Sequence, residues 1–533
     1  MFTALMTRMT RMTRMTRMTR MAGNARMAGH ARLERSVRWL LIGLCLSGSL
    51  QAASPVAPSA SDGRGGAAGV TAGAAAGAAA GAKLPAGIPA SGIPASGAPA
   101  SGAPASGGPA SGAKALSPDK HPAQFSASAR RLYDRARAQL LQVRTLLNGS
   151  QASVGSGFVV TADGLVITNY HVVSQHALEP ERYHLQFSTP DGESGDLELL
   201  DVDVRRDLAL LRLVGQPELI RRMTAAALPF RPADRPLDKG ERIYSMGNPH
   251  DVAFAVVEGT YNGLVERSFD PLIYYSGSIN PGMSGGPVLD EEGEVVGVNV
   301  STMFFSQQMS FLVPGGHAAA LLARSRTSAP LKGPAWPRLR EQVMAYQDEL
   351  VRNFLAQPWR SMDHPRYRLP IPQEQYMRCW GSASPADAQG LQMQRTQCRM
   401  EQALFISEAL QTGYLSVTEE AYDGSTLGAL RFSRQFSASF QNERLGGADR
   451  DRTAPYCTED FVQQKEGPPL RAVACMRAYR KLEGLYDVSV LVTNVDAATE
   501  GALGRFDARG VSFANATRLT RHYLQGFAWT TPR

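Results

Sequence analysis

Ser284 lies in a stretch whose composition points directly to chemistry. The stretch reads GSINPGMSGGP, and glycine occupies positions 277, 282, 285 and 286. A serine hydroxyl attacks a carbonyl efficiently only when a base accepts its proton and hydrogen-bond donors stabilise the oxyanion that forms. Glycine permits backbone geometries that other residues resist, so the amides of Gly282 and Ser284 can turn toward one point. The stretch predicts a nucleophile at Ser284 with an oxyanion hole made by these two amides, although an ordinary turn between strands would also fit it.

His171 and Asp207 are the candidates for the base and for the acid that orients it. In TNYHVV, His171 stands at the end of an apolar strand, where a loop or short helix should begin. An imidazole that titrates near pH ~6.5 can accept a proton and return it. In DVRRDLALL, Asp207 directly precedes a buried strand, and a buried carboxylate needs a partner such as the Nδ1 proton of a histidine. Asp201 and Asp203 are rivals, but the residue that adjoins the LALL strand fits better.

Short strands separated by turn residues must position these three side chains. The strongest signal is the Ala162-Asp163-Gly164 turn between two apolar runs, which is typical of a hairpin. Nine further short runs are likewise rich in β-branched and other apolar residues and are bounded by turn residues. They lie at residues 183–188, 197–202, 208–214, 242–246, 253–265, 272–276, 286–289, 295–300 and 309–313. With little helix between them, they favour an antiparallel barrel or sandwich over alternating β and α units.

Taken in order, these segments resemble the HtrA-type (Deg) peptidase domain of the chymotrypsin-fold serine peptidases. The resemblance covers about residues 153–314 and rests on GSGFVV, TNYHVV, DLALL, MGNP, INPGMSGGP, GEVVGVNV and SFLVP. It implies an all-β domain of two six-stranded barrels with the site in the cleft between them. It also implies that His171 is the general base, Asp207 its orienting acid and Ser284 the nucleophile. The sequence departs from the family at Met283, where HtrA-type enzymes usually have asparagine.

The substrate pocket is expected to be apolar. Ile279, Val298, Asn299 and Val300 lie before and after the nucleophile and contribute no acid. A pocket of this kind accepts a small or medium apolar residue before the scissile bond.

Four segments make up the chain as we interpret it. Residues 1–53 combine a basic low-complexity tract with a signal peptide, whose apolar run is WLLIGLCLSGSL at 39–50. Residues 54–118 are rich in Ala, Gly, Pro and Ser and should form a disordered linker. Residues 119–328 hold the peptidase domain. Residues 329–533 begin with an amphipathic helix at 336–357 and continue as an α+β domain of unknown function, in which we find no PDZ-like loop.

The cysteines point to an exported protein. Removal of the signal peptide, with Cys45, leaves four of the five cysteines, all in the C-terminal segment. An even number in an exported chain suggests disulfides. Spacing favours Cys379 with Cys398 and Cys457 with Cys475, but four cysteines permit three connectivities.

Charge and histidine spacing exclude several classes of function. The formal charge of +8 comes largely from arginines ahead of the apolar run at residues 39–50, in a segment that we expect to be removed, so nucleic-acid binding is not implied. The histidines show no HExxH or paired-ligand spacing, so we expect neither a metal nor a cofactor. The mature chain should have no stable membrane span, and an oligomer is possible. We therefore expect a periplasmic or extracellular serine endopeptidase that acts on proteins or peptides in envelope protein processing or quality control. The alternative is a non-catalytic binding or scaffold protein on the same fold, and an esterase with the same triad is a third hypothesis.

Overall fold

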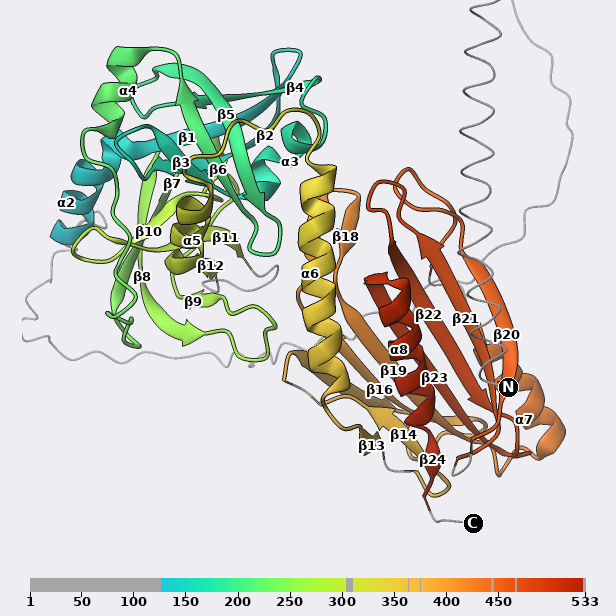
Figure 1. Cartoon of the computed structure of the whole chain (residues 1–533). Coiled ribbons are helices and arrows are strands. Elements are labelled where there is room, and N and C mark those ends of the chain that lie inside the picture. Colours follow the sequence, from blue (N-terminus) through green and yellow to red (C-terminus); the bar gives the residue numbers. More distant parts are fainter. Residues whose placement is uncertain are drawn as a thin grey trace, which may run out of the picture. The chain divides into compact units, whose positions relative to one another are not determined.

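Two closed six-stranded antiparallel barrels form the first half of the described chain in the computed structural model (Figure 1). The structure describes residues 126–302, 310–362, 364–373, 375–441, 445–464 and 467–530. The first barrel has the order β1-β2-β3-β6-β5-β4 and the second the order β10-β11-β12-β9-β8-β7. The fold class predicted for the peptidase domain is confirmed.

The barrel strands closely follow the predicted runs. The first barrel consists of β1 (Leu140–Leu147), β2 (Ser150–Val159), β3 (Leu165–Thr168), β4 (Tyr183–Ser188), β5 (Ser194–Asp203) and β6 (Leu208–Val214). The second consists of β7 (Arg242–Gly247), β8 (Ala255–Leu264), β9 (Ile273–Tyr275), β10 (Pro287–Leu289), β11 (Val295–Thr302) and β12 (Ser310–Pro314).

Short helices connect and cover the barrels. They are α2 (Ala127–Ala136), η1 (Arg137–Gln139), α3 (Tyr170–Leu178), α4 (Pro217–Thr224), η2 (Pro249–Asp251) and α5 (Gly315–Ser325). The Ser126 side chain caps α2 by accepting a hydrogen bond from the Ala129 amide at 3.0 Å. Helices α4 and α5 were missed in the sequence, although Pro217 at the first turn of α4 is a common helix start.

A seven-stranded antiparallel sheet dominates the C-terminal region, in the order β15-β16-β19-β23-β22-β21-β20. Its strands are β15 (Met377–Ala383), β16 (Gln392–Met400), β19 (Leu415–Asp423), β20 (Tyr456–Val462), β21 (Leu470–Ala478), β22 (Leu485–Asn494) and β23 (Glu500–Ser512). Smaller elements are β13 (Arg360–Met362), β14 (Tyr367–Ile371), β17 (Leu404–Ser407), β18 (Leu410–Thr412), α7 (Ala429–Ser439) and β24 (Ala528–Trp529). The region is therefore strand-rich, with α6 (Trp336–Leu355) and α8 (Phe513–Gln525) packed against β23.

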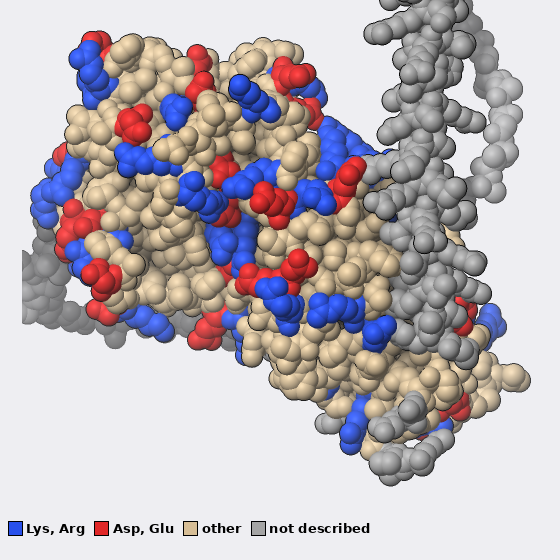
Figure 2. All heavy atoms as spheres, in the orientation of Figure 1, with Lys and Arg blue, Asp and Glu red and all other residues tan. Residues whose placement is uncertain are grey.

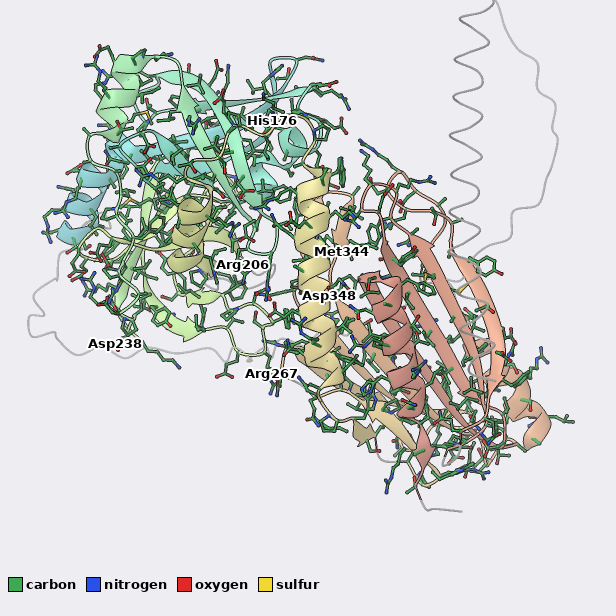
Figure 3. All side chains as sticks on the ribbon, viewed as in Figure 1. His176, Arg206, Asp238, Arg267, Met344 and Asp348 are labelled. Atoms are coloured by element: carbon green, nitrogen blue, oxygen red, sulfur yellow. A yellow bond between two sulfur atoms is a disulfide. The ribbon has the colours of Figure 1, made fainter. Side chains whose placement is uncertain are left out.

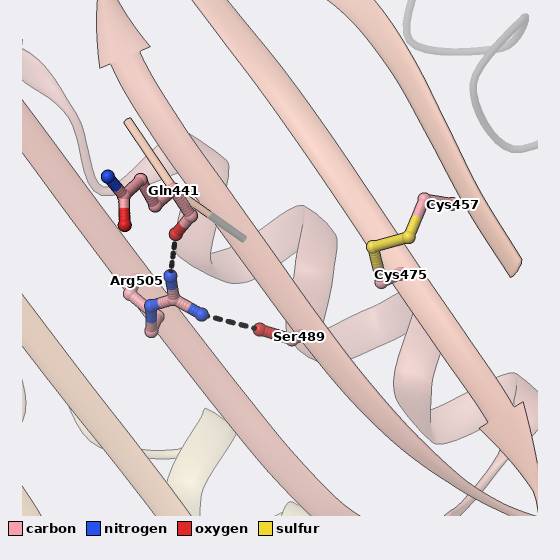
Figure 4. Close-up of a disulfide and its surroundings, with 5 residues drawn as sticks. All are labelled: Gln441, Cys457, Cys475, Ser489 and Arg505. Carbon is pink, nitrogen blue, oxygen red and sulfur yellow. Dashed lines mark hydrogen bonds between the residues drawn. A yellow bond between two sulfur atoms is a disulfide. The ribbon is translucent and has the colours of Figure 1, made fainter. Parts of the chain in front are cut away.

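Two disulfides close the hairpins at the opposite edges of this sheet. Cys379 and Cys398 face each other across β15 and β16, and Cys457 and Cys475 across β20 and β21. This pairing is the one that the spacing favours. Figure 4 shows the second disulfide, with Arg505 nearby donating to Ser489 Oγ at 3.4 Å.

Helix α6 connects the barrels to the sheet. Figure 3 labels Met344 and Asp348 along this helix, and the Asp348 carboxylate accepts a hydrogen bond from Asn515 of α8 at 2.7 Å. On the barrel side, Arg338 of α6 donates to Asp201 of β5 at 3.0 Å. Basic and acidic side chains adjoin in a band across the face seen in Figure 2. One apolar cluster includes buried residues of the first barrel, of α6 and of the sheet, so these parts share a core.

Two of the four predicted segments, and one of their boundaries, can be compared with the structure as follows. Residues 1–53 and 54–118 lie outside the described residues. We keep the division at residue 328 as a proposal, and it falls between the end of α5 and the start of α6.

Candidate active site

The first barrel brings His171 and Asp207 together. Strands β3 and β6 are antiparallel, with Thr168 opposite Ala209, so the end of β3 and the start of β6 lie at the same edge. His171 follows β3 in the first turn of α3, and Asp207 directly precedes β6. Asp207 Oδ2 lies 2.6 Å from His171 Nδ1, and Asp207 Oδ1 accepts the His171 amide at 2.8 Å. One carboxylate therefore fixes both the ring and the backbone of the histidine.

The backbone of Asp207 is held in an uncommon conformation. Its φ is 53°, in the left-handed region that residues other than glycine seldom adopt. The Asp207 carbonyl accepts hydrogen bonds from the Tyr170 amide at 3.1 Å and from Asn169 Nδ2 at 2.8 Å. These contacts from the segment before His171 offset the strain, which is a pattern common at functional sites.

Opposing effects set the protonation of His171. Burial disfavours the charged imidazolium, whereas the charge of Asp207 and its hydrogen bond favour it. The net result raises the pKa of His171 above its ordinary value. A histidine in this environment is a stronger proton acceptor than a free imidazole.

The second barrel supplies the nucleophile loop between β9 and β10. Gly282 has a φ of 94° and Gly285 a φ of 86°, so both use the freedom expected of glycine. The amides of Met283, Gly285 and Gly286 donate to carbonyls of the protein. Within the described part of the chain, by contrast, the amides of Gly282 and Ser284 have no acceptor. These are the two amides assigned to the oxyanion hole.

The peptide before Gly282 is oriented by a contact outside the loop. The Pro281 carbonyl accepts the His250 amide at 2.8 Å. A trans peptide directs its N–H opposite to its C=O, so the Gly282 N–H points away from His250. It is therefore available to an acceptor on the other side of the loop.

Ser156 joins the two barrels at this point, and its role was missed in the sequence. Its amide on β2 donates to the Ser284 carbonyl at 2.7 Å, and its hydroxyl donates to the Gly282 carbonyl at 2.7 Å. The same hydroxyl accepts the Asn248 amide at 2.9 Å. The signal was the serine between two glycines in GSGFVV, but only the fold shows which loop it contacts.

Close backbone packing brings the nucleophile loop to the histidine segment. A Cβ on Gly285 would lie 2.3 Å from Thr168 Oγ1 and 2.8 Å from the Asn169 nitrogen, two residues before His171. A Cβ on Gly155 would lie 2.5 Å from Val172 and 2.9 Å from the Ser284 carbonyl. The Ser284 hydroxyl donates a hydrogen bond to the Val300 carbonyl at 3.4 Å. This contact is long and weak, and Ser284 Oγ makes no hydrogen bond to His171 in the structure.

Met283 occupies the core of the second barrel. Its side chain is completely buried beside Ile243 and Val288, and its sulfur accepts the Asn280 amide at 3.5 Å. Apolar packing therefore holds the loop where HtrA-type domains usually have asparagine. A flexible thioether suits such an irregular space.

Three of the four residues predicted to line the substrate pocket are buried in the structure. Val298 is fully buried in the barrel core, and Asn299 is fully buried with its amide donating to the Met246 and Met283 carbonyls at 3.0 and 3.2 Å. A substrate cannot reach these side chains, because the core and the nucleophile loop occupy them. Ile279 is also almost completely buried, whereas Val300 is partly exposed beside Ser284.

The rival carboxylates have other partners. Asp201 pairs with Arg338 and accepts the hydroxyl of Ser325. Asp203 accepts the Arg206 amide at 3.1 Å and pairs with Arg324. Both carboxylates therefore bind residues of α5, of α6 or of the turn before β6, and neither binds His171.

Comparison with known proteins identifies the class. Residues 155–298 match the family model for the trypsin-like peptidase domain. Together with the two closed barrels, this match shows that this part of the chain has the chymotrypsin-like fold of the trypsin-like peptidase domains. Proteins similar to this part of the chain include several that are named HTRA or DegP-like serine proteases.

Three of these relatives come from distant organisms. "Serine protease HTRA1" of Xenopus tropicalis is 32% identical over 184 residues, which are 33% of this chain and 36% of that protein. "Serine protease HTRA3" of Homo sapiens is 31% identical over 179 residues, 32% of this chain and 37% of that protein. "Probable periplasmic serine endoprotease DegP-like" of Ectopseudomonas mendocina is 32% identical over 164 residues, 30% of this chain and 31% of that protein. The chain thus spans about a third of the length of these relatives.

The match to a solved serine endoprotease from Yersinia pestis covers 38% of this chain and 67% of that chain, with 21% sequence identity and a TM-score of 0.32.

The described residues contain neither a metal-binding cluster nor a membrane-spanning helix. Among them, no group of three or more His, Cys, Asp or Glu side chains could hold a metal ion. No helix in these ranges has the length and apolar character needed to cross a bilayer.

Proposed function

We propose that the chain is an exported serine endopeptidase that hydrolyses peptide bonds through an acyl-enzyme on Ser284. His171 is the general base, Asp207 orients it, and the amides of Gly282 and Ser284 form the oxyanion hole. The observation that carries the proposal is the combination of a fixed His171–Asp207 pair with two unpaired amides on the adjoining nucleophile loop.

Acylation follows from these positions. His171 Nε2 accepts the proton of Ser284 Oγ while the oxygen bonds to the substrate carbonyl carbon. The carbonyl oxygen becomes an oxyanion and accepts hydrogen bonds from the two amides. The imidazolium then donates its proton to the leaving amine as the C–N bond breaks, which leaves an ester on Ser284.

Deacylation repeats the steps with water. His171 accepts a proton from the water as its oxygen attacks the ester carbon, and returns that proton to Ser284 Oγ when the acid leaves. Asp207 remains ionised throughout and stabilises the imidazolium. No cofactor takes part.

Envelope proteins are the substrates that we propose. Some relatives are named periplasmic serine endoproteases, and the apolar run at residues 39–50 has the pattern of a signal peptide. The two disulfides are compatible with an oxidising compartment.

Fluorophosphonate labelling tests the proposal against a non-catalytic protein on the same fold. The wild-type protein should be labelled on Ser284 and should degrade casein, and Ser284→Ala and His171→Ala should abolish both. Ser278→Ala changes an exposed serine of the same loop and should leave both unchanged. Folded wild-type protein without any label would favour the non-catalytic alternative. Cleavage of simple esters but not of casein would favour an esterase.

A further inference from the structure

A hairpin of the C-terminal region lies against the helix that carries His171. The hairpin consists of β17 and β18, and Ile406 at its centre is fully buried. The Ile406 carbonyl accepts a hydrogen bond from the Tyr170 hydroxyl at 2.8 Å. Tyr170 is itself fully buried and directly precedes His171. The hairpin is therefore fastened beside the catalytic histidine by a buried polar contact.

Phe405 presents its ring to the imidazole. Leu404 and Ile406 are buried in the apolar core, and Phe405 is partly buried against the same core. The centroid of the Phe405 ring lies 6.1 Å from that of His171, with an interplanar angle of 78°. It lies 6.2 Å from the ring of Tyr170 at 68°. Both are edge-to-face arrangements, which aromatic rings favour over a stacked sandwich.

The base of the hairpin is anchored in the sheet. Thr412, the last residue of β18, shares a hydrogen bond of 2.7 Å with the Tyr479 hydroxyl. The Tyr479 hydroxyl lies 2.5 Å from Asp487 Oδ1, and this fully buried carboxylate also accepts Arg477 Nε at 2.9 Å. The position of Phe405 is thus set by a buried polar network rather than by a free loop.

We propose that Phe405 is a positioning residue for His171 and that the C-terminal region thereby completes the active site. The inference rests on the proposed peptidase function. Asp207 holds the Nδ1 edge of the imidazole, and Phe405 restricts the ring from a second direction. A catalytic side chain must stay within about 0.5 Å and 10–20° of its productive geometry, and one contact at Nδ1 leaves rotation about that bond. The apolar ring also keeps water from part of the imidazole and so opposes its protonation.

The test compares Phe405→Ala and Phe405→Leu in the full-length protein. The readouts are the rate of fluorophosphonate labelling of Ser284 as a function of pH, and kcat and KM for fluorescent casein. Phe405→Ala should slow labelling and lower kcat by about 10- to 100-fold with little change in KM, because a misplaced base slows proton transfer rather than binding. The acidic limb of its pH profile should move to higher pH, since water gains access to the imidazole. Phe405→Leu retains an apolar contact and should restore most of the rate.

Two further variants keep the test decisive. Phe461→Ala removes a half-exposed phenylalanine from the edge strand β20 and should leave the rate and pH profile unchanged. Tyr170→Phe removes the hydrogen bond to Ile406 but keeps the ring, so a smaller effect in the same direction is expected. If Phe405→Ala does not fold, a wild-type rate and pH profile for Tyr170→Phe overturns the proposal.

The outcomes separate this inference from the proposed function. A wild-type protein that is not labelled contradicts the peptidase function itself. Normal labelling of the wild type with an unchanged rate and acidic limb in Phe405→Ala overturns only the positioning role. Faster labelling of Phe405→Ala would show that the hairpin obstructs the site, and it would likewise overturn the proposal.

Discussion

Replacing Ser156 with alanine tests whether the two barrels cooperate at the nucleophile loop. The Ser156 side chain is fully buried, and its hydroxyl makes two hydrogen bonds, one to the Gly282 carbonyl and one from the Asn248 amide. The substitution leaves this carbonyl and this amide buried without a partner. The Ser156 amide keeps its bond to the Ser284 carbonyl, so the loop is loosened rather than released.

The size of the effect follows from these two bonds. Each net hydrogen bond contributes about 1 kcal/mol, and an unpaired buried polar group costs about 1–3 kcal/mol. A total of about 2–4 kcal/mol is therefore expected in the free energy of unfolding. We assign about 2 kcal/mol of this loss to the equilibrium between the reactive conformation of the nucleophile loop and its other conformations. The fraction of molecules with a reactive loop then falls about 30-fold.

The assay measures the rate of fluorophosphonate labelling of Ser284 together with denaturant unfolding. Ser325→Ala is the matched control, because it also removes a buried serine hydroxyl, one that donates to Asp201 instead. Both variants should lose stability, but only Ser156→Ala should be labelled more slowly, by about 30-fold. Folded Ser156→Ala with a labelling rate within about twofold of the wild type would refute the reasoning.

Four further predictions concern pH and stability. Activity should rise with pH through the pKa of His171, with a midpoint above about 6.5, and Asp207→Asn should lower this midpoint and reduce kcat by about 10⁴-fold in initial-rate measurements. Because folding raises the pKa of His171, its contribution to the free energy of unfolding is present in full below the pKa of the unfolded chain. This contribution is lost as the pH rises through the pKa of the folded protein. Denaturant unfolding of the wild type and His171→Ala at several pH values should show this dependence. Asp487→Asn should destabilise the protein by about 3–5 kcal/mol in urea unfolding, because Arg477 loses a buried partner; an unchanged midpoint would contradict this. Replacing both Cys457 and Cys475 with alanine should lower the free energy of unfolding by about 3 kcal/mol, given their separation of 18 residues. The rate of fluorophosphonate labelling of Ser284 should stay unchanged. A slower rate would show that this edge of the sheet affects the site.

Most barrel strands could be predicted because their signals are local. Alternation of apolar residues and turn residues such as Gly164 located β4 and β6 at their observed bounds and the other barrel strands within a few residues. Helix α4 was missed because it spans only eight residues, about two turns, between strong strand signals. The order of the C-terminal sheet could not be predicted, because the pairing of β19 with β23 joins two groups of strands that lie far apart in the chain.

The candidate triad could be predicted for a different reason. Ser284, His171 and Asp207 each stand beside a recognisable local feature, a glycine-rich loop or the end of an apolar strand. The pocket residues had no such feature. Val298, Asn299 and Val300 are consecutive residues of β11, and how deeply each is buried depends on how β10, β12 and the nucleophile loop pack against this strand.

The sequence by itself determined the strand pattern, the glycines of the nucleophile loop and the residue types that acyl transfer needs, because these properties depend on neighbours along the chain. Only the tertiary structure decided which surfaces meet. It placed Ser156 of one barrel on the loop of the other, and it brought Phe405, 234 positions after His171 in the chain (405 − 171), against the imidazole. Such contacts are made when separate elements bury their apolar faces together, and a local pattern carries no record of the partner face.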